Sequence, residues 1–89
     1  MQNLNHFQKV TIVLVTFKSQ HIIDKCLDNL DEKYNKILIE NSNDTNFTNY
    51  LEKKYKNLKC YNTGYDAGFG PAMNIGFEKT KTEYIISMN

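Results

Sequence analysis

The chain has 89 residues and a formal net charge of +1, with eleven lysines, no arginine and ten acidic residues. A chain of this length forms one small domain, and its balanced charge shows no clustered basic stripe of the kind that indicates nucleic-acid binding. Bidentate arginine clamps are excluded, so any contact with phosphate must come from lysine, backbone N–H groups or a metal.

The N-terminal segment and the two cysteines indicate an intracellular protein. Residues 1–9 are predicted to form a polar tail, without the apolar run of a signal peptide. No stretch approaches the ~20 apolar residues of a membrane span. Cys26 and Cys60 are too few for a disulfide scaffold and lack the spacing of a zinc site. We expect a cytoplasmic location; peripheral association with the inner face of the membrane is the alternative, although this segment shows no sign of it.

The first half of the chain alternates strand and helix patterns. Val10 to Thr16 (VTIVLVT) is a continuous β-branched run, which is typical of a strand buried on both faces. Ser19 can cap the helix that follows. Lys36 to Glu40 (KILIE) is a second apolar strand that ends on a carboxylate. The apolar residues at helical spacing between the two strands are Ile22, Ile23, Cys26, Leu27 and Leu30.

The second half continues the alternation. Asp44 or Thr45 can cap a second helix, and Leu58 to Tyr61 is a short third strand. Gly70 and Pro71 are predicted to form the cap and first position of a third helix, and Glu83 to Met88 is a fourth strand. The predicted stripe of the second helix is Phe47, Tyr50, Leu51, Lys54 and Tyr55, and the predicted inward face of the third is Ala72, Met73, Gly76 and Phe77.

The order β-α-β-α-β-α-β predicts an α/β fold with a Rossmann-like, mostly parallel sheet and helices on both faces. Ligands of such sheets bind outside the carboxyl ends of the strands. Polar residues are concentrated in the segments that follow the strands, so a site is expected there. These segments are Thr16 to Ser19, Glu40 to Asp44, Thr63 to Gly70, and the end at Asn89.

Several residues of these segments are candidates for ligand contact. Glu40 and Asn41 could bind a base edge or a ribose hydroxyl, or Glu40 could be a solvated strand end or a helix cap. Asp66 and Gly68 lead into a helix whose free N–H groups favour an anion, unless the segment is a plain strand-to-helix turn. Asn74 lies one turn inside this helix, where its amide could reach the ligand or bond the loop backbone.

Two nucleotide-binding motifs are absent. Gly68-Phe69-Gly70 begins a GxGxxG pattern, but Met73 occupies the third glycine position and the pattern follows the third strand instead of the first. No GK[ST] sequence ends a phosphate loop. These absences argue against a dinucleotide-dependent oxidoreductase and against a P-loop NTPase.

Five segments in order resemble family 2 glycosyltransferases of the GT-A fold, and most closely their rhamnosyltransferase-like group. Each is weak alone, but their order and spacing are specific. On this resemblance, residues 10–89 form the N-terminal, nucleotide-sugar-binding half of a GT-A domain. The segments are VTIVLVTFK (10–18), CLDNL (26–30), IENSND (39–44), DAGFGPAMNIG (66–76) and EYIISMN (83–89).

The resemblance implies roles for the candidate residues. Val15, Thr16 and Phe17 would lie beside the nucleotide base, Glu40 and Asn41 would contact base and ribose, and Asp66 and Gly68 would lie near the ribose and phosphates. Asn89 would be the first position of an NPD or DxD motif, whose later Asp helps to hold Mg²⁺ or Mn²⁺ on the diphosphate. The expected partners are a nucleoside-diphosphate sugar and a glycan or lipid-linked acceptor, the latter bound by a C-terminal half, with inversion by a later general base.

The chain departs from the family pattern in four respects. Lys18 replaces an Asn, Glu40 an Asp, and Asp66 an Asn, while the metal-binding Asp and the catalytic base are not present. We therefore expect little catalysis from these 89 residues alone. The alternative hypothesis is a non-catalytic nucleotide-binding or interaction module.

Overall fold

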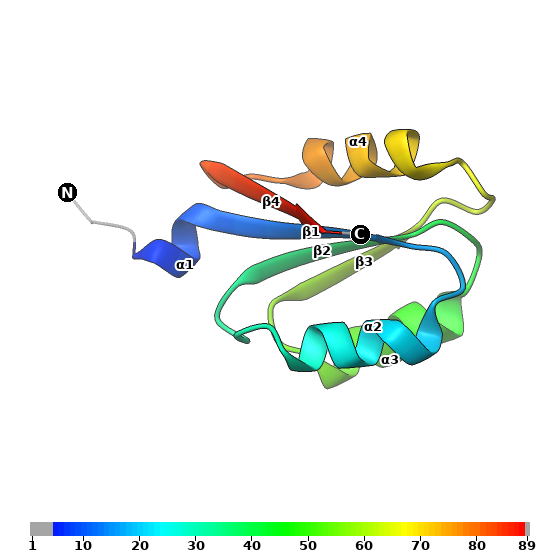
Figure 1. The fold of residues 1–89 in the computed structure, drawn as a ribbon, viewed down its shortest axis with the longest axis horizontal. Helices are drawn as coiled ribbons and strands as arrows, with labels where there is room; N and C mark the ends of the chain where they lie inside the picture. Colours follow the sequence, from blue (N-terminus) through cyan, green and yellow to red (C-terminus); the bar gives the residue numbers. More distant parts are fainter. Residues whose placement is uncertain (1–4, 89) are drawn as a thin grey trace.

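The computed structural model describes residues 5–88 and confirms an α/β fold built on one parallel sheet (Figure 1). The strand order is β3-β2-β1-β4, so the first strand is internal. Helices link β1 to β2 and β2 to β3, which are neighbours, whereas the third helical crossover joins β3 at one edge of the sheet to β4 at the other. The strands are β1 (Val10–Thr16), β2 (Asn35–Glu40), β3 (Leu58–Asn62) and β4 (Tyr84–Met88).

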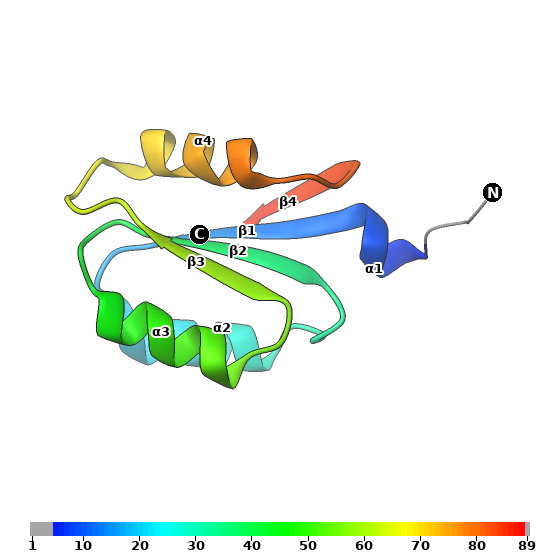
Figure 2. The ribbon, with the colours of Figure 1, turned by 180° about the vertical axis from the view of Figure 1, so that it is seen from behind.

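Helices cover both faces of the sheet, as the sequence predicts. Helices α2 (Gln20–Asp28) and α3 (Thr45–Lys54) lie side by side on one face, and α4 (Phe69–Lys79) lies on the other (Figure 1 and, from behind, Figure 2). Two apolar clusters fill these layers, one around Leu14 and Leu38 under α2 and α3, and one around Val13 and Ile39 under α4. Alternate residues of β1 and β2 enter opposite clusters, which explains why both strands are continuous apolar runs.

The register of the sheet places three strand ends together. Thr16 of β1 pairs with Glu40 of β2, and Glu40 pairs with Asn62 of β3. The segments that follow these strands therefore begin at the same level, at the right-hand end of the sheet in Figure 1. We call this the carboxyl end of the sheet.

A single helical turn, α1 (His6–Lys9), lies in the expected N-terminal tail of residues 1–9. The Asn5 side chain accepts from the Gln8 N–H at 3.0 Å while the Gln8 side chain accepts from the Asn5 N–H at 3.0 Å. This reciprocal capping box stabilises a turn that has no apolar periodicity of its own. Within residues 5–88, no helix has the length and apolar character needed to cross a membrane.

Helix α4 begins two residues earlier than predicted, because Gly68 and not Gly70 is its N-cap. The Ala72 N–H donates to the Gly68 carbonyl oxygen at 3.3 Å, and Gly68 adopts φ 87°, a left-handed conformation that glycine tolerates best. Pro71 is therefore the third helical residue, still within the first turn, where its missing N–H has no helical partner to lose. Phe77, predicted to face inward, is 41% exposed.

Two further local predictions need correction. Ser19 occupies the N-cap position of α2, but its hydroxyl donates to the Phe17 carbonyl oxygen at 3.0 Å and not toward the helix. Tyr50, placed in the apolar stripe of α3, is 44% exposed and its hydroxyl donates to Asp24. Asp44, by contrast, caps α3 as predicted by accepting from the Phe47 N–H at 3.2 Å.

Strand β4 differs from the other strands in its exposure. Within the described residues it pairs only with β1, and Tyr84, Ile85 and Ile86 are 57%, 41% and 45% exposed. The apolar run that the sequence shows is therefore an edge strand here, and α4 packs mainly against β1 and β2.

Candidate functional site

The carboxyl end of the sheet is organised by the buried carboxylate of Glu40. One oxygen accepts from the Thr16 hydroxyl at 2.9 Å. The other accepts from the Ser42 hydroxyl at 2.6 Å and from the Lys18 N–H at 3.3 Å. Because Glu40 is 0% exposed, it is neither a solvated strand end nor a helix cap: it ties the segment after β1 to the end of β2.

Asn41 makes the corresponding link to the segment after β3. Its amide nitrogen donates to the Gly68 carbonyl oxygen at 2.8 Å, and its amide oxygen accepts from the Ala67 N–H at 2.8 Å and the Thr63 hydroxyl at 3.0 Å. The Asn41 backbone N–H also donates to the Thr16 carbonyl oxygen at 2.7 Å. One side chain with both donors and acceptors thus fixes a strand-to-helix loop that has few apolar contacts of its own.

Asp66 and Gly68 lie at the exposed rim of this arrangement. The Asp66 carboxylate accepts from the Gly68 N–H at 3.2 Å, which closes a short turn before α4. Both residues are exposed, and the first N–H groups of α4 follow directly. The turn therefore presents a carboxylate and the start of a helix to solvent at the same end of the sheet.

The remaining predicted site residues divide between core and surface. The Val15 side chain packs against the apolar cluster under α4, and Thr16 is buried with its hydroxyl on Glu40. Phe17 is 45% exposed at the carboxyl end. Asn74 is exposed and, within residues 5–88, its side chain makes no hydrogen bond, so of its two alternatives the bond to the loop backbone is not formed. Thr16, Phe17, Glu40, Asn41 and Gly68 are brought to one end of the molecule.

Beside the Glu40 network lies a cavity of about 400 Å³ lined by Lys18, Gln20, Ser42, Asn43 and Asp44. Sequence reasoning does not single out Gln20 or Ser42 as site residues. The Gln20 amide donates to the Asp44 carboxylate at 2.6 Å across the cavity wall. A sequence signal does exist, since both residues lie within a few positions of a strand end, but polar residues in loops are too common for position alone to select them.

Lys18 has an unusual backbone conformation in this cavity wall, with φ 51°. A left-handed conformation is unfavourable for lysine and is tolerated better by asparagine. The family pattern that the chain resembles has Asn at this position, a residue type better suited to this conformation than lysine.

With this geometry established, the comparison with known families is decisive. A family model, described as Glycosyl transferase family 2, matches residues 11–89. The chain belongs to this family. Searches of curated proteins and of solved structures gave no significant match. The domain is therefore a glycosyltransferase domain, and membership implies a nucleotide-sugar donor and an acceptor as its general substrate classes.

The described part of this glycosyltransferase domain does not itself supply a metal site. Within residues 5–88 no group of three or more His, Cys, Asp or Glu side chains could hold a metal ion. Glu40 already accepts three hydrogen bonds, and Asp44 caps α3. Asn89, predicted to begin the acidic motif, lies outside the described residues.

The cysteines of the glycosyltransferase domain are not placed for chemistry at the site. Cys26 and Cys60 are free and half-buried. Burial, with smaller contributions from Glu52 and Glu40, raises the pKa of the Cys60 thiol to about 12. A thiol of that pKa stays protonated at neutral pH and is a poor nucleophile.

Proposed function

We propose that this domain binds the nucleoside diphosphate of a nucleotide-sugar donor at the carboxyl end of its sheet. The observation that carries the proposal is the pair of hydrogen-bond networks centred on Glu40 and Asn41, which join the segments after β1, β2 and β3. Parallel α/β sheets bind ligands at this end. Family membership supplies the ligand class.

The residues have different roles in this proposal. Phe17, exposed beside the β1 end, offers a ring on which a base can stack. Glu40 acts by holding the Thr16 hydroxyl and the Lys18 backbone in place, because its carboxylate is buried. The Asp66–Gly68 turn is proposed to approach the ribose and phosphates, with the N–H groups at the start of α4 facing the negative charge.

The reaction of the parent enzyme is a further part of the proposal. We propose transfer of a sugar with inversion to a glycan or lipid-linked acceptor, as in polysaccharide biosynthesis, with a rhamnosyl donor as the first candidate on the motif likeness. Dependence on Mg²⁺ or Mn²⁺ is proposed on the same likeness alone, since the described residues form no cluster of three or more His, Cys, Asp or Glu side chains. We also propose a cytoplasmic location.

Nucleotide binding is tested by NMR titration of ¹⁵N-labelled chain with UDP, dTDP and GDP. We expect amide shifts at Phe17, Ser42 and Gly68, with an affinity in the millimolar range or tighter. A Phe17→Ala variant should weaken binding because stacking on a base contributes ~1–3 kcal/mol, whereas Phe77→Ala, an equally exposed aromatic on α4, should not. A folded chain that shows no shifts with any of the three nucleotides would contradict the proposal.

Turnover separates an enzyme from the alternative, a nucleotide-binding module. The assay measures release of nucleoside diphosphate from UDP-, dTDP- and GDP-sugars, with and without Mn²⁺. We expect binding but negligible turnover from the 89-residue chain. A chain that also carries the acidic motif and a general base should turn over; binding without turnover in that chain would favour the module.

A further inference from the structure

A second polar region lies at the opposite end of the sheet from the donor site. A cavity of about 800 Å³ opens there, between the amino ends of β1, β2 and β3 and the C-terminal ends of α3 and α4. It is lined by six of the eleven lysines and by one of the ten acidic residues, Glu52. We call it the lysine cavity; its lysines are Lys36, Lys53, Lys56, Lys59, Lys79 and Lys81.

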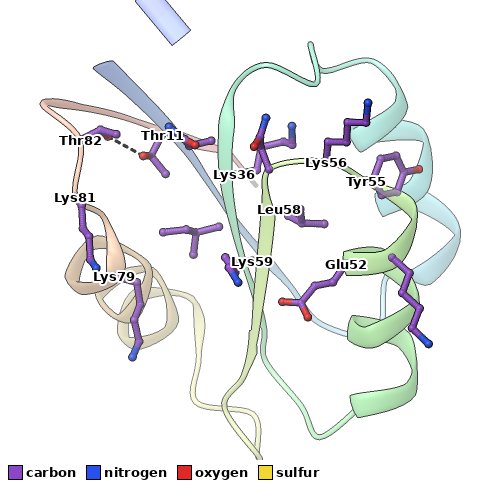
Figure 3. A pocket seen from close by; sticks show the side chains of 14 residues that line it. Thr11, Lys36, Glu52, Tyr55, Lys56, Leu58, Lys59, Lys79, Lys81 and Thr82 are labelled. Atoms are coloured by element: carbon purple, nitrogen blue, oxygen red, sulfur yellow. Dashed lines mark hydrogen bonds between the residues drawn. The ribbon is translucent and has the colours of Figure 1, made fainter. Parts of the chain in front are cut away.

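The lysines come from separate elements that only the fold brings together. Figure 3 shows Lys79 and Lys81 on the α4 side of the lysine cavity, Lys56 on the α3 side, and Lys59 on the strand between them. Lys59 and Lys81 are 22 positions apart in the sequence and belong to β3 and to the loop before β4. This arrangement explains why a nearly neutral sequence shows no basic stripe and yet has a local excess of positive charge.

The charges of the lysine cavity have no acidic partners among the described residues. The ion pair found in residues 5–88 is Lys54–Asp24, which lies outside the cavity lining. The carboxylate of Glu52 accepts from the Cys60 N–H at 2.8 Å and from no lysine. Six lysines against one glutamate give the lining an excess of positive charge, which a bound anion can offset.

Helix dipoles account for only some of these lysines. Lys53 and Lys79 lie in the last turns of α3 and α4, where a cation interacts favourably with the dipole. Lys59 and Lys81 lie outside helices, so the dipole does not explain their position in the cavity.

Lys36 is a structural residue of the cavity. It is 3% exposed, and its ammonium donates to the Tyr34 carbonyl oxygen at 3.0 Å and to the Glu32 carbonyl oxygen at 3.4 Å. Its hydrogen bonds are thus directed to the loop that precedes β2 and not into the cavity. The exposed cations are Lys53, Lys56, Lys59, Lys79 and Lys81.

We propose that the lysine cavity binds a ligand that carries two or more linked phosphate groups. Lysine ammonium groups are compact point charges that bind phosphate without the planar geometry that arginine requires. A cavity of about 800 Å³ is within the range that encloses small ligands. Thr11 and Thr82 also belong to the lining, where their hydroxyls hydrogen-bond to each other at 2.7 Å.

This binding site is separate from the proposed donor site. The two sites lie at opposite ends of β1, which has seven residues and so spans roughly 20 Å. One diphosphate cannot reach both ends. The proposal therefore does not depend on nucleotide binding, and the two can fail independently.

The test is an NMR titration of ¹⁵N-labelled chain with sodium tripolyphosphate at low ionic strength. We expect saturable amide shifts at Asn57, Lys59 and Thr82. Shifts no larger than those produced by sodium chloride of equal ionic strength, or shifts confined to the Glu40 end, would overturn the proposal.

Matched charge variants distinguish binding at the lysine cavity from general electrostatic attraction of tripolyphosphate to the positively charged surface. Lys59→Gln/Lys81→Gln removes two exposed lysines of the cavity, and Lys25→Gln/Lys33→Gln removes two exposed lysines outside it. We expect the first variant to weaken tripolyphosphate binding by about tenfold or more and the second by less than about twofold, because nearby charges dominate at short range. Equal weakening by both variants, each shown to be folded by circular dichroism, would overturn the proposal.

Vesicle sedimentation identifies the source of the phosphate. Vesicles of phosphatidylcholine are compared with vesicles that also contain cardiolipin, whose headgroup holds two phosphate groups joined through glycerol. Tripolyphosphate binding without sedimentation supports a soluble ligand. Sedimentation with the anionic vesicles that Lys59→Gln/Lys81→Gln abolishes, and Lys25→Gln/Lys33→Gln does not, supports an array of lipid headgroups. Absence of binding in both assays overturns the proposal.

Discussion

The polar groups at the two ends of the sheet are arranged in opposite ways. At the carboxyl end, Glu40 and Asn41 are buried and hydrogen-bonded, and no buried side-chain nitrogen or oxygen within residues 5–88 lacks a partner. At the amino end, exposed lysines line a cavity without acidic partners. At the carboxyl end, hydrogen bonds between polar residues therefore fix the shape of the site. At the amino end, charges without acidic partners indicate where a bound anion could stabilise the protein.

The strongest way to break the carboxyl end is to remove Asn41. Asn41→Leu leaves the Ala67 N–H and the Gly68 carbonyl without their partner, and we expect a loss of about 3 kcal/mol in the free energy of unfolding. Urea unfolding followed by circular dichroism measures it. Asn43→Ala, an exposed neighbour, should change stability by less than about 0.5 kcal/mol. Equal effects of the two changes would show that the Asn41 network is not structural.

Helix α4 connects the two ends, and Gly76 sets its distance from the sheet. A Cβ at Gly76 would overlap Cγ1 of Val13, so either the buried Val13 side chain or α4 must shift. We expect Gly76→Ala to destabilise the fold by about 2 kcal/mol, measured by urea unfolding.

Gly70→Ala is the matched control, because nothing lies within 4 Å of its added Cβ. Here alanine should be neutral or stabilise the helix by up to about 1 kcal/mol. If Gly76→Ala were as well tolerated as Gly70→Ala, close contact with Val13 would not set the position of α4 on the sheet.

Local backbone strain gives a smaller contrast between the two ends. Lys18 at the carboxyl end and Asn57 at the amino end both have left-handed φ values, 51° and 60°. Of the two, only Asn57 is a residue type that readily adopts a left-handed conformation. We expect Lys18→Asn to raise stability by about 0.5 kcal/mol, with Lys25→Asn, on α2, lowering it slightly. Thermal unfolding measures both; a destabilised Lys18→Asn variant would show that the lysine side chain outweighs the backbone strain.

The smallest expected effect concerns pH at the amino end. Burial lowers the pKa of Lys36 below its usual 10.5, although Asp31 and Glu32 act to raise it. Between the lowered pKa and 10.5 the unfolded chain binds more protons than the folded chain, so Lys36 adds stability as pH rises through this range and loses it as pH falls. The stability difference between wild type and Lys36→Met should therefore grow in favour of wild type as pH approaches 10.5. If the stability difference between wild type and Lys36→Met did not change with pH, the lowered pKa of Lys36 would be contradicted.

Much of the fold can be predicted from the sequence. The runs in β1 and β2 identify buried parallel strands, and Asp44 is recognisable as the cap of α3. The predicted start of α4 is wrong, because Pro71 is compatible with any position in the first turn and only the backbone conformation identifies Gly68 as the N-cap. The inward placement of Phe77 is also wrong, because helical spacing alone does not show where the sheet stops covering the helix.

The position of the candidate site in the fold can be predicted from the sequence, but its side-chain contacts cannot. Thr16, Glu40, Asn41 and Gly68 gather at the carboxyl end, as the parallel topology requires. The inward direction of Glu40 is not predictable, because two of its three donors, Thr16 and Lys18, come from a segment more than 20 positions away in the chain. The distances from these donors to the Glu40 carboxylate follow from strand register and loop conformation, which no local sequence pattern encodes.

By itself the sequence determined the alternation of strands and helices, and hence a parallel sheet with its loops at one end, because these features follow from local apolar periodicity. The tertiary structure alone decided which polar groups became internal links and which charges stayed unpaired. Hydrogen bonds and charge clusters depend on distances between residues far apart in the chain. Thr16 reaches Glu40, and Lys59 joins Lys81 in one cavity lining, only once the strands and α4 have packed.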